Sequence, residues 1–124
     1  MKITCGTDII EIKRIRESIE TIGVKFLQRV FTENEINYCE SKGQQKYQHY
    51  AARFAAKEAA FKAISESLND KYAISWKDVE VENDKNGKPL IYIDKINKEQ
   101  IENIDLSISH CKEYACANVV VLYK

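Results

Sequence analysis

An alanine-rich segment near the middle of this chain restricts the possible folds more than any other feature. Its centre, RFAAKEAAFKAI (residues 53–64), consists mostly of strong helix formers, and the helical pattern runs from Gln45 to about Leu68. At about 100° per residue, small side chains fall on one side of this helix and bulky ones on the other. The small set is Ala52, Ala56, Ala59, Ala60 and Ala63; the bulky set includes Phe54 and Phe61. A helix with two apolar sides is largely enclosed, so the rest of the chain must fold around it.

Shorter helices and strands before and after this helix in the sequence are expected to enclose it. Sequence patterns before it predict a strand over 2–11 and helices over 12–22, 24–30 and 33 to about 41. The capping box TENE (32–35) marks the start of the third helix. Patterns after it predict strands over 76–83, 89–93, 105–110 and 114–123. A short helix is predicted near 97–103, between the second and third of these strands. Asn86-Gly87 marks the first hairpin turn. This order predicts an α+β fold, with a mostly antiparallel sheet packed against a long central helix and shorter helices.

Length and composition limit the function classes. The chain has 124 residues with one proline and four glycines, which leaves little room for a linker and predicts one domain over residues 1–124. Its 19 basic and 19 acidic residues balance, so nothing indicates a general nucleic-acid binder. No apolar run reaches the length of about 18 residues that a membrane span needs, and the start MKITCGTDII does not resemble a signal peptide. Four cysteines without metal-binding spacing then predict reduced thiols and a cytoplasmic protein.

Two carboxylates occupy positions where acids are unusual. Asp8 lies inside the predicted first strand and faces the same way as Gly6, which leaves space there for a ligand or a close backbone. Glu58 lies on the bulky side of the central helix, so it is at least partly buried and must be paired, protonated or bound to metal. Glu58 could simply pair with Lys62 one turn on, and Asp8 could cap a neighbouring helix. Alternatively, the two carboxylates together could hold Mg²⁺, which takes one or two carboxylates alongside waters and substrate phosphates.

Six stretches of the chain resemble one enzyme family in order and spacing. The three longest are GTDIIEIKRI (6–15), RFAAKEAAFKA (53–63) and LSISHCKEYACANVV (106–120). The shorter ones are FTENEINYCES (31–41), ISWKDVEV (74–81) and NGKP (86–89). Together they resemble the holo-acyl-carrier-protein synthases, the short single-unit 4'-phosphopantetheinyl transferases, nearly from end to end.

The resemblance implies a specific reaction and assembly. Members of this family move the phosphopantetheine arm of coenzyme A to a serine of apo acyl carrier protein, release adenosine 3',5'-bisphosphate and need Mg²⁺. They are homotrimers with active sites between subunits, so Asp8 is expected from one subunit and the Glu58 helix or the nucleotide contacts from its neighbour. By motif match, Asp8 and Glu58 are the metal ligands, and Lys62 is the third catalytic residue. The family's carrier-binding helix matches the helix that holds Arg14.

The same match assigns residues to coenzyme A and leaves some alternatives open. The implied coenzyme contacts are Arg53, Glu58, Lys62, Ser65, Asn86, Gly87, Lys88, Pro89 and His110. From the residues alone, His110 is as easily a packed core histidine, and Asn86-Gly87 is simply a turn. One stretch departs from the family: residues 65–75 contain no glycine where the family has a turn close to GTGI. A carrier-binding protein without catalysis and an unrelated Mg²⁺-dependent phosphohydrolase are the competing functions.

Overall fold

The computed structural model describes residues 1–65, 68 and 74–124, and it confirms the α+β class. Ten-residue strands β1 (Lys2–Glu11), β5 (Tyr114–Tyr123) and β4 (Ile101–His110) form an antiparallel sheet in the order β1-β5-β4. A separate antiparallel ribbon consists of β2 (Val79–Asn83) and β3 (Pro89–Ile93). The helices are α1 (Ile12–Ile22), α2 (Val24–Val30), α3 (Glu33–Glu40) and α4 (Lys46–Ile64), with short 3₁₀ turns at Gly43–Gln45 and Trp76–Asp78.

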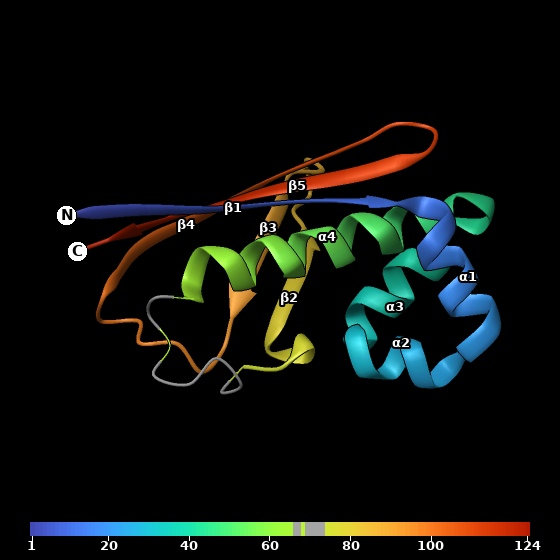
Figure 1. Cartoon of the computed structure of the whole chain (residues 1–124), viewed down its shortest axis with the longest axis horizontal. Coiled ribbons are helices and arrows are strands. Elements are labelled where there is room, and N and C mark those ends of the chain that lie inside the picture. The colour runs from blue at the N-terminus through green and yellow to red at the C-terminus, as the bar shows by residue number, and fades with distance from the viewer. Residues whose placement is uncertain (66–67, 69–73) are drawn as a thin grey trace.

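Helix α4 lies at the centre of the molecule, as its two apolar sides require. It runs along one face of the three-stranded sheet, and the β2–β3 ribbon crosses it, while α1 to α3 gather around its N-terminal end (Figure 1). Both chain termini lie together at one end of the sheet in Figure 1. No helix in the described part of the chain is both long and apolar enough to cross a membrane.

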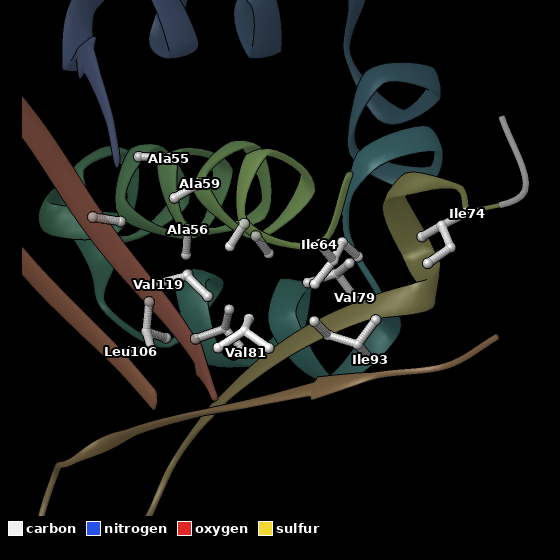
Figure 2. Close-up of a cluster of buried hydrophobic side chains, with 14 residues drawn as sticks. Ala55, Ala56, Ala59, Ile64, Ile74, Val79, Val81, Ile93, Leu106 and Val119 are labelled. Atoms are coloured by element: carbon white, nitrogen blue, oxygen red, sulfur yellow. The ribbon is translucent and has the colours of Figure 1, made fainter. Parts of the chain in front are cut away.

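The small side of α4 is what lets the sheet approach so closely. Ala55, Ala56 and Ala59 are fully buried, and they lie near Val119 of β5 in Figure 2. Gly6 of β1 belongs to this contact, because a Cβ atom placed there would lie 1.9 Å from the carbonyl oxygen of Ala59. The space beside Gly6 is therefore taken by the backbone of α4, which decides between the two uses that the sequence left open.

Replacing Gly6 by alanine is expected to lower the free energy of unfolding by about 2–3 kcal/mol, near the upper end for overpacked cores. The added methyl group meets backbone atoms of α4, which cannot rotate away as a side chain can. Urea denaturation with an unchanged m-value would measure the loss. The control is Cys5→Ala on the exposed opposite face of β1, which should change stability by less than about 0.5 kcal/mol. Equal stability of Gly6→Ala and wild type would show that α4 does not press on β1.

Two expected boundaries are wrong at the ends of α4 and β2. Helix α4 ends at Ile64 rather than near Leu68, and residues 66–67 of the expected extension lie outside the described residues. The strand expected over 76–83 begins only at Val79. Its first three residues form a 3₁₀ turn because the Asp78 carboxylate accepts a hydrogen bond from the backbone of Ser75 at 2.8 Å.

The short helix expected near 97–103 is also wrong. Only a single turn forms there, in which Gln100 donates its backbone N–H to the carbonyl of Asn97 at 3.1 Å. Strand β4 then starts at Ile101, four residues before the expected Asp105, and pairs with β5 along its length. Pairing with β5 places Ile101 and Ile104 against the core, which outweighs the weak helical pattern of this segment.

Candidate functional site

Asp8, Lys62 and Glu58 come together where β1 crosses the C-terminal half of α4. Asp8 lies on the inner face of β1, with 19% of its side chain exposed. The Lys62 ammonium lies 3.4 Å from Asp8 Oδ1 and donates a hydrogen bond to the carbonyl oxygen of Thr7 at 2.9 Å. Glu58 lies one helical turn before Lys62 and is half-buried. The strand and the helix thus bring two carboxylates and one ammonium to the same place.

The groups around Glu58 supply too little positive charge to balance its carboxylate. Burial raises the pKa of the Glu58 carboxyl, and the negative charge of Asp8 raises it further, while Lys62 lowers it in part. Two carboxylates beside a single ammonium carry a net negative charge, which a divalent cation would neutralise. Among the described residues, no third His, Cys, Asp or Glu joins Asp8 and Glu58 in a group that could hold a metal ion, so this is a two-carboxylate site. Such a site fits Mg²⁺ completed by water and substrate phosphates.

The geometry shows which contacts Asp8 and Lys62 make. In the described part of the chain, the recorded partner of the Asp8 carboxylate is the Lys62 ammonium and not a helix N-terminus. Lys62 forms an ion pair with Asp8 and also lowers the pKa of Glu58, so its ammonium acts on both carboxylates. One chain brings Asp8 and Glu58 together, so of the two contributions expected from a neighbouring subunit the nucleotide contacts are the one that stays a prediction.

A second polar cluster surrounds the ring of Tyr38, closer to the start of α4. Arg53 is 3% exposed, and its guanidinium carbon lies 4.1 Å from the centroid of the Tyr38 ring. One guanidinium nitrogen donates to Asn83 Oδ1 at 2.7 Å, and Asn83 pairs with Pro89 across the β2–β3 ribbon. The buried Nε of Arg53 has no hydrogen-bond partner among the residues that the structure describes.

Further basic groups face the same ring. Lys42 Nζ lies 4.7 Å from the Tyr38 centroid, and the ring of His49 lies 5.6 Å from Tyr38 and 6.4 Å from His110. Burial lowers the pKa of His49, and the charges of Arg53 and Lys42 lower it further. His110 is exposed, so the alternative of a packed core histidine is wrong. Basic groups that repel one another in this way form a suitable site for an anion such as a phosphate.

The remaining expected coenzyme contacts lie at separate places. Asn86-Gly87 does form a hairpin turn, with Gly87 at φ 85°. Lys88 forms an ion pair with Asp105 of β4 at 3.1 Å. Ser65 lies exposed at the end of α4 and donates its hydroxyl hydrogen to the carbonyl of Lys62 at 3.1 Å. The glycine-free stretch after Ser65 lies mostly outside the described residues, at 66–67 and 69–73.

Sequence reasoning missed a fully buried ion pair next to Glu58. Lys57 and Glu35 are both inaccessible to solvent, and Lys57 Nζ lies 2.7 Å from Glu35 Oε1. The same ammonium donates hydrogen bonds to the carbonyls of Val30, Trp76 and Val79 at 2.9, 3.0 and 2.7 Å. Glu35 is also the acid of the α3 capping box. Periodicity showed only that Lys57 points away from both apolar sides, and could not show which segments would surround it.

Sequence reasoning also gave His49 no role, because no motif or unusual neighbour in the sequence marked this histidine as part of a site. The available signal was its position four residues before Arg53, which puts both side chains on one face of α4. Tyr38 and Lys42 have the same spacing. The site that these pairs form becomes visible only when α3 packs against α4.

Comparison with known proteins identifies relatives over almost the whole chain. Residues 4–119 match the model of the 4'-phosphopantetheinyl transferase superfamily. A holo-[acyl-carrier-protein] synthase of Ruminiclostridium cellulolyticum is 45% identical over 98% of this chain and 92% of its own. The corresponding synthase of Protochlamydia amoebophila is 45% identical over 97% of this chain and 98% of its own.

Solved structures of synthases share the fold. The Bacillus anthracis holo-(acyl-carrier-protein) synthase in complex with CoA (3',5'-ADP) is 39% identical, with a TM-score of 0.78 over 95% of this chain and 94% of its own. The Helicobacter pylori synthase in complex with coenzyme A is 32% identical, with a TM-score of 0.82 over 95% of this chain and 99% of its own. Sequence and fold agree that this chain is a transferase that belongs to the 4'-phosphopantetheinyl transferase superfamily.

Proposed function

We propose that this chain transfers the 4'-phosphopantetheine arm of coenzyme A to a serine of an apo acyl carrier protein and releases adenosine 3',5'-bisphosphate. The observation that carries the proposal is the meeting of Asp8, Glu58 and Lys62 at one place in a chain of this family. Relatives along almost the full length are named holo-[acyl-carrier-protein] synthases, and two similar structures were solved with coenzyme A. Residues 1–124 would act as a single transferase domain.

In the proposed reaction, the serine oxygen attacks the β-phosphate of coenzyme A while the nucleotide leaves. Asp8 and Glu58 would hold Mg²⁺, which supplies charge neutralisation and alignment of the pyrophosphate when bound. Lys62 has a half-exposed ammonium next to these acids, so it can reach a phosphate oxygen as a mobile point charge. Its hydrogen bond to the Thr7 carbonyl keeps the ammonium on the β1 side of the site.

The basic cluster around Tyr38 supports the proposed nucleotide contacts. Arg53 and His110, both expected to touch coenzyme A, each lie close enough to His49 to lower its pKa. Asn83 connects Arg53 to the hairpin that holds Asn86, Gly87 and Lys88, which are proposed to lie along the adenosine. In coenzyme A the 3'-phosphate is the anionic group that is not part of the reacting pyrophosphate, so a basic cluster separate from the Asp8 site suits it.

Replacing His110 by alanine is expected to raise the KM for coenzyme A about tenfold, the effect of losing one hydrogen bond to a charged group. His110 is exposed at the end of β4, so the fold should not change. The matched control is a second substrate, 3'-dephospho-coenzyme A, whose KM should be almost unaffected by the substitution. If the KM values of both substrates rose equally, His110 would not contact the 3'-phosphate.

The surface of α1 supports the proposed docking of an acidic carrier protein. Arg14 is exposed there beside Lys13 and Arg16, and the following corner exposes Ile22 and Val24. An apolar patch bordered by basic residues suits an acidic partner with an apolar helix face, and association should weaken as salt is added.

The outer face of the three-stranded sheet supports the proposed homotrimer. Ile3 and Ile9 of β1 and Val120 of β5 are 67%, 65% and 43% exposed and point away from α4. Light scattering would give the mass of the assembly. All four cysteines are free thiols, which supports the proposed cytoplasmic location.

The deciding experiment is the mass of a purified apo acyl carrier protein after incubation with this protein, coenzyme A and Mg²⁺. A gain of one phosphopantetheine that a chelator abolishes is the expected result. Absence of any gain over several carriers, with coenzyme A shown to bind, would favour a carrier-binding protein without catalysis. Release of inorganic phosphate from small esters without a carrier would favour a phosphohydrolase.

A further inference from the structure

The side of α4 that carries Glu58 also carries a wall of aromatic rings. Phe54 lies one turn before Glu58, and Phe61 lies nearly one turn after it. The half-buried ring of Trp76 covers both phenylalanines, since its centroid lies 4.9 Å from that of Phe54 in a stacked arrangement and 5.3 Å from that of Phe61 edge to face. These three rings are called the aromatic wall below. Trp76 has no part in the reaction as proposed above.

Helical geometry places Glu58 between the aromatic wall and the polar groups of the site. At about 100° per residue, Glu58 lies about 40° around α4 from Phe54, and Lys62 lies about 40° farther in the same direction. Asp8 lies on that side as well, because Lys62 pairs with it at 3.4 Å. Phe61 lies about 20° from Phe54 in the opposite direction. Glu58 therefore has aromatic rings on one flank and Asp8 with Lys62 on the other.

The buried Lys57 fixes the aromatic wall from the flank that lies away from Glu58. Its ammonium donates hydrogen bonds to the carbonyls of Trp76 at 3.0 Å and Val79 at 2.7 Å, so it holds both ends of the 3₁₀ turn. The same ammonium pairs with Glu35 at 2.7 Å, and neither side chain of this pair is accessible to solvent. Trp76 therefore cannot move away from α4 without breaking the hydrogen bonds of a fully buried ion pair.

We infer that Trp76 is a positioning residue for the transfer reaction, which acts by directing the Glu58 carboxylate toward Asp8. The inference rests on the proposed function, because it takes Glu58 and Asp8 as the Mg²⁺ ligands. A glutamate side chain has several rotatable bonds, and ordering it when a metal binds costs free energy. The ring of Trp76 blocks conformations in which Glu58 turns away from Asp8, so part of this ordering takes place when the protein folds. Groups that orient a metal ligand contribute about 10–100-fold to metal affinity or activity.

The test measures metal binding without turnover. Mn²⁺ replaces Mg²⁺ as a paramagnetic probe, and electron paramagnetic resonance follows its binding with saturating coenzyme A and no carrier protein. Trp76→Leu is expected to raise the Kd for Mn²⁺ about tenfold, the lower end of the range for groups that orient a metal ligand. Trp76→Phe keeps a ring against Phe54, so its Kd should stay within about threefold of wild type. The affinity of Trp76→Leu for coenzyme A without metal, from calorimetry, should stay within about twofold of wild type.

Steady-state rates separate positioning from a merely structural role. With saturating coenzyme A, the transfer rate of Trp76→Leu should fall at low Mg²⁺ and recover as Mg²⁺ is raised. The matched control Tyr92→Leu removes a ring that is 52% exposed on β3, and it should change neither the Kd for Mn²⁺ nor the rate.

Three results would overturn the inference. The first is a wild-type Kd for Mn²⁺ in Trp76→Leu. The second is a rate that stays low at every Mg²⁺ concentration, which would show a structural role alone. The third is a loss of coenzyme A affinity as large as the loss of Mn²⁺ affinity, which would mean that the ring contacts the coenzyme. Absence of Mn²⁺ binding to the wild-type protein would instead refute the metal site of the proposed function.

Discussion

Replacing Lys57 by methionine is expected to lower the free energy of unfolding by about 3–5 kcal/mol, the usual loss when one member of a buried ion pair is removed. The substitution leaves the Glu35 carboxylate uncompensated in an environment without solvent, and it also removes the donor to three backbone carbonyls. Methionine has a similar shape, so the missing charge and hydrogen bonds, rather than a cavity, would cause the loss. Urea denaturation would measure it.

The same helix offers a matched control for this loss. Lys62→Met removes an ammonium that is 54% exposed and pairs with Asp8 at 3.4 Å, which should cost less than about 1 kcal/mol. A double variant, Lys57→Met with Glu35→Met, should recover part of the stability, because no charge remains buried. A loss in Lys57→Met no larger than that in Lys62→Met would mean that the buried ammonium does not hold the segments together.

Sequence patterns predicted the elements whose signals are local. The capping box at Thr32 and Glu35 is present in the structure, and the first strand and first helix have the expected bounds. The errors occur where a long-range contact decides between two local possibilities. Residues 97–103 have weak helical character, yet Ile101 joins a strand because β5 pairs with it.

The site residues likewise divide into those that the sequence predicted and those that only the structure shows. Asp8 attracted attention because an acid inside a strand needs an explanation, and the structure places it beside Glu58 and Lys62. No pattern in the sequence predicted that Lys57 would be enclosed by four segments, or that His49 would face His110 across two elements. Contacts of this kind depend on how helices and strands pack, and only a structure gives them. The resemblance to the family assigned Arg53 to the coenzyme, but only the structure shows that its buried Nε has no hydrogen-bond partner among the described residues.

Replacing Glu58 by glutamine is expected to reduce transfer at least 100-fold, because even outer-shell partners of a bound metal contribute about 10–100-fold. The same substitution should not reduce the stability of the metal-free protein. Because the folded-state pKa of Glu58 is raised, its contribution to stability is fully present below the ordinary glutamate pKa and is lost as pH rises through the raised value. Glu58→Gln should therefore gain stability relative to wild type over that rise in pH.

Thermal unfolding with and without Mg²⁺ separates a metal ligand from a structural residue. Mg²⁺ should raise the Tm of wild type but not that of Glu58→Gln, because a ligand stabilises only the protein that binds it. Glu102→Gln, at an exposed position of β4, should keep both the activity and the Mg²⁺ effect. If Glu58→Gln kept more than about a tenth of the wild-type rate, Glu58 would not be a metal ligand. Low activity, intact stability and no response to Mg²⁺ would mean that the chain keeps a poorly compensated acid at this position because the transfer reaction requires it.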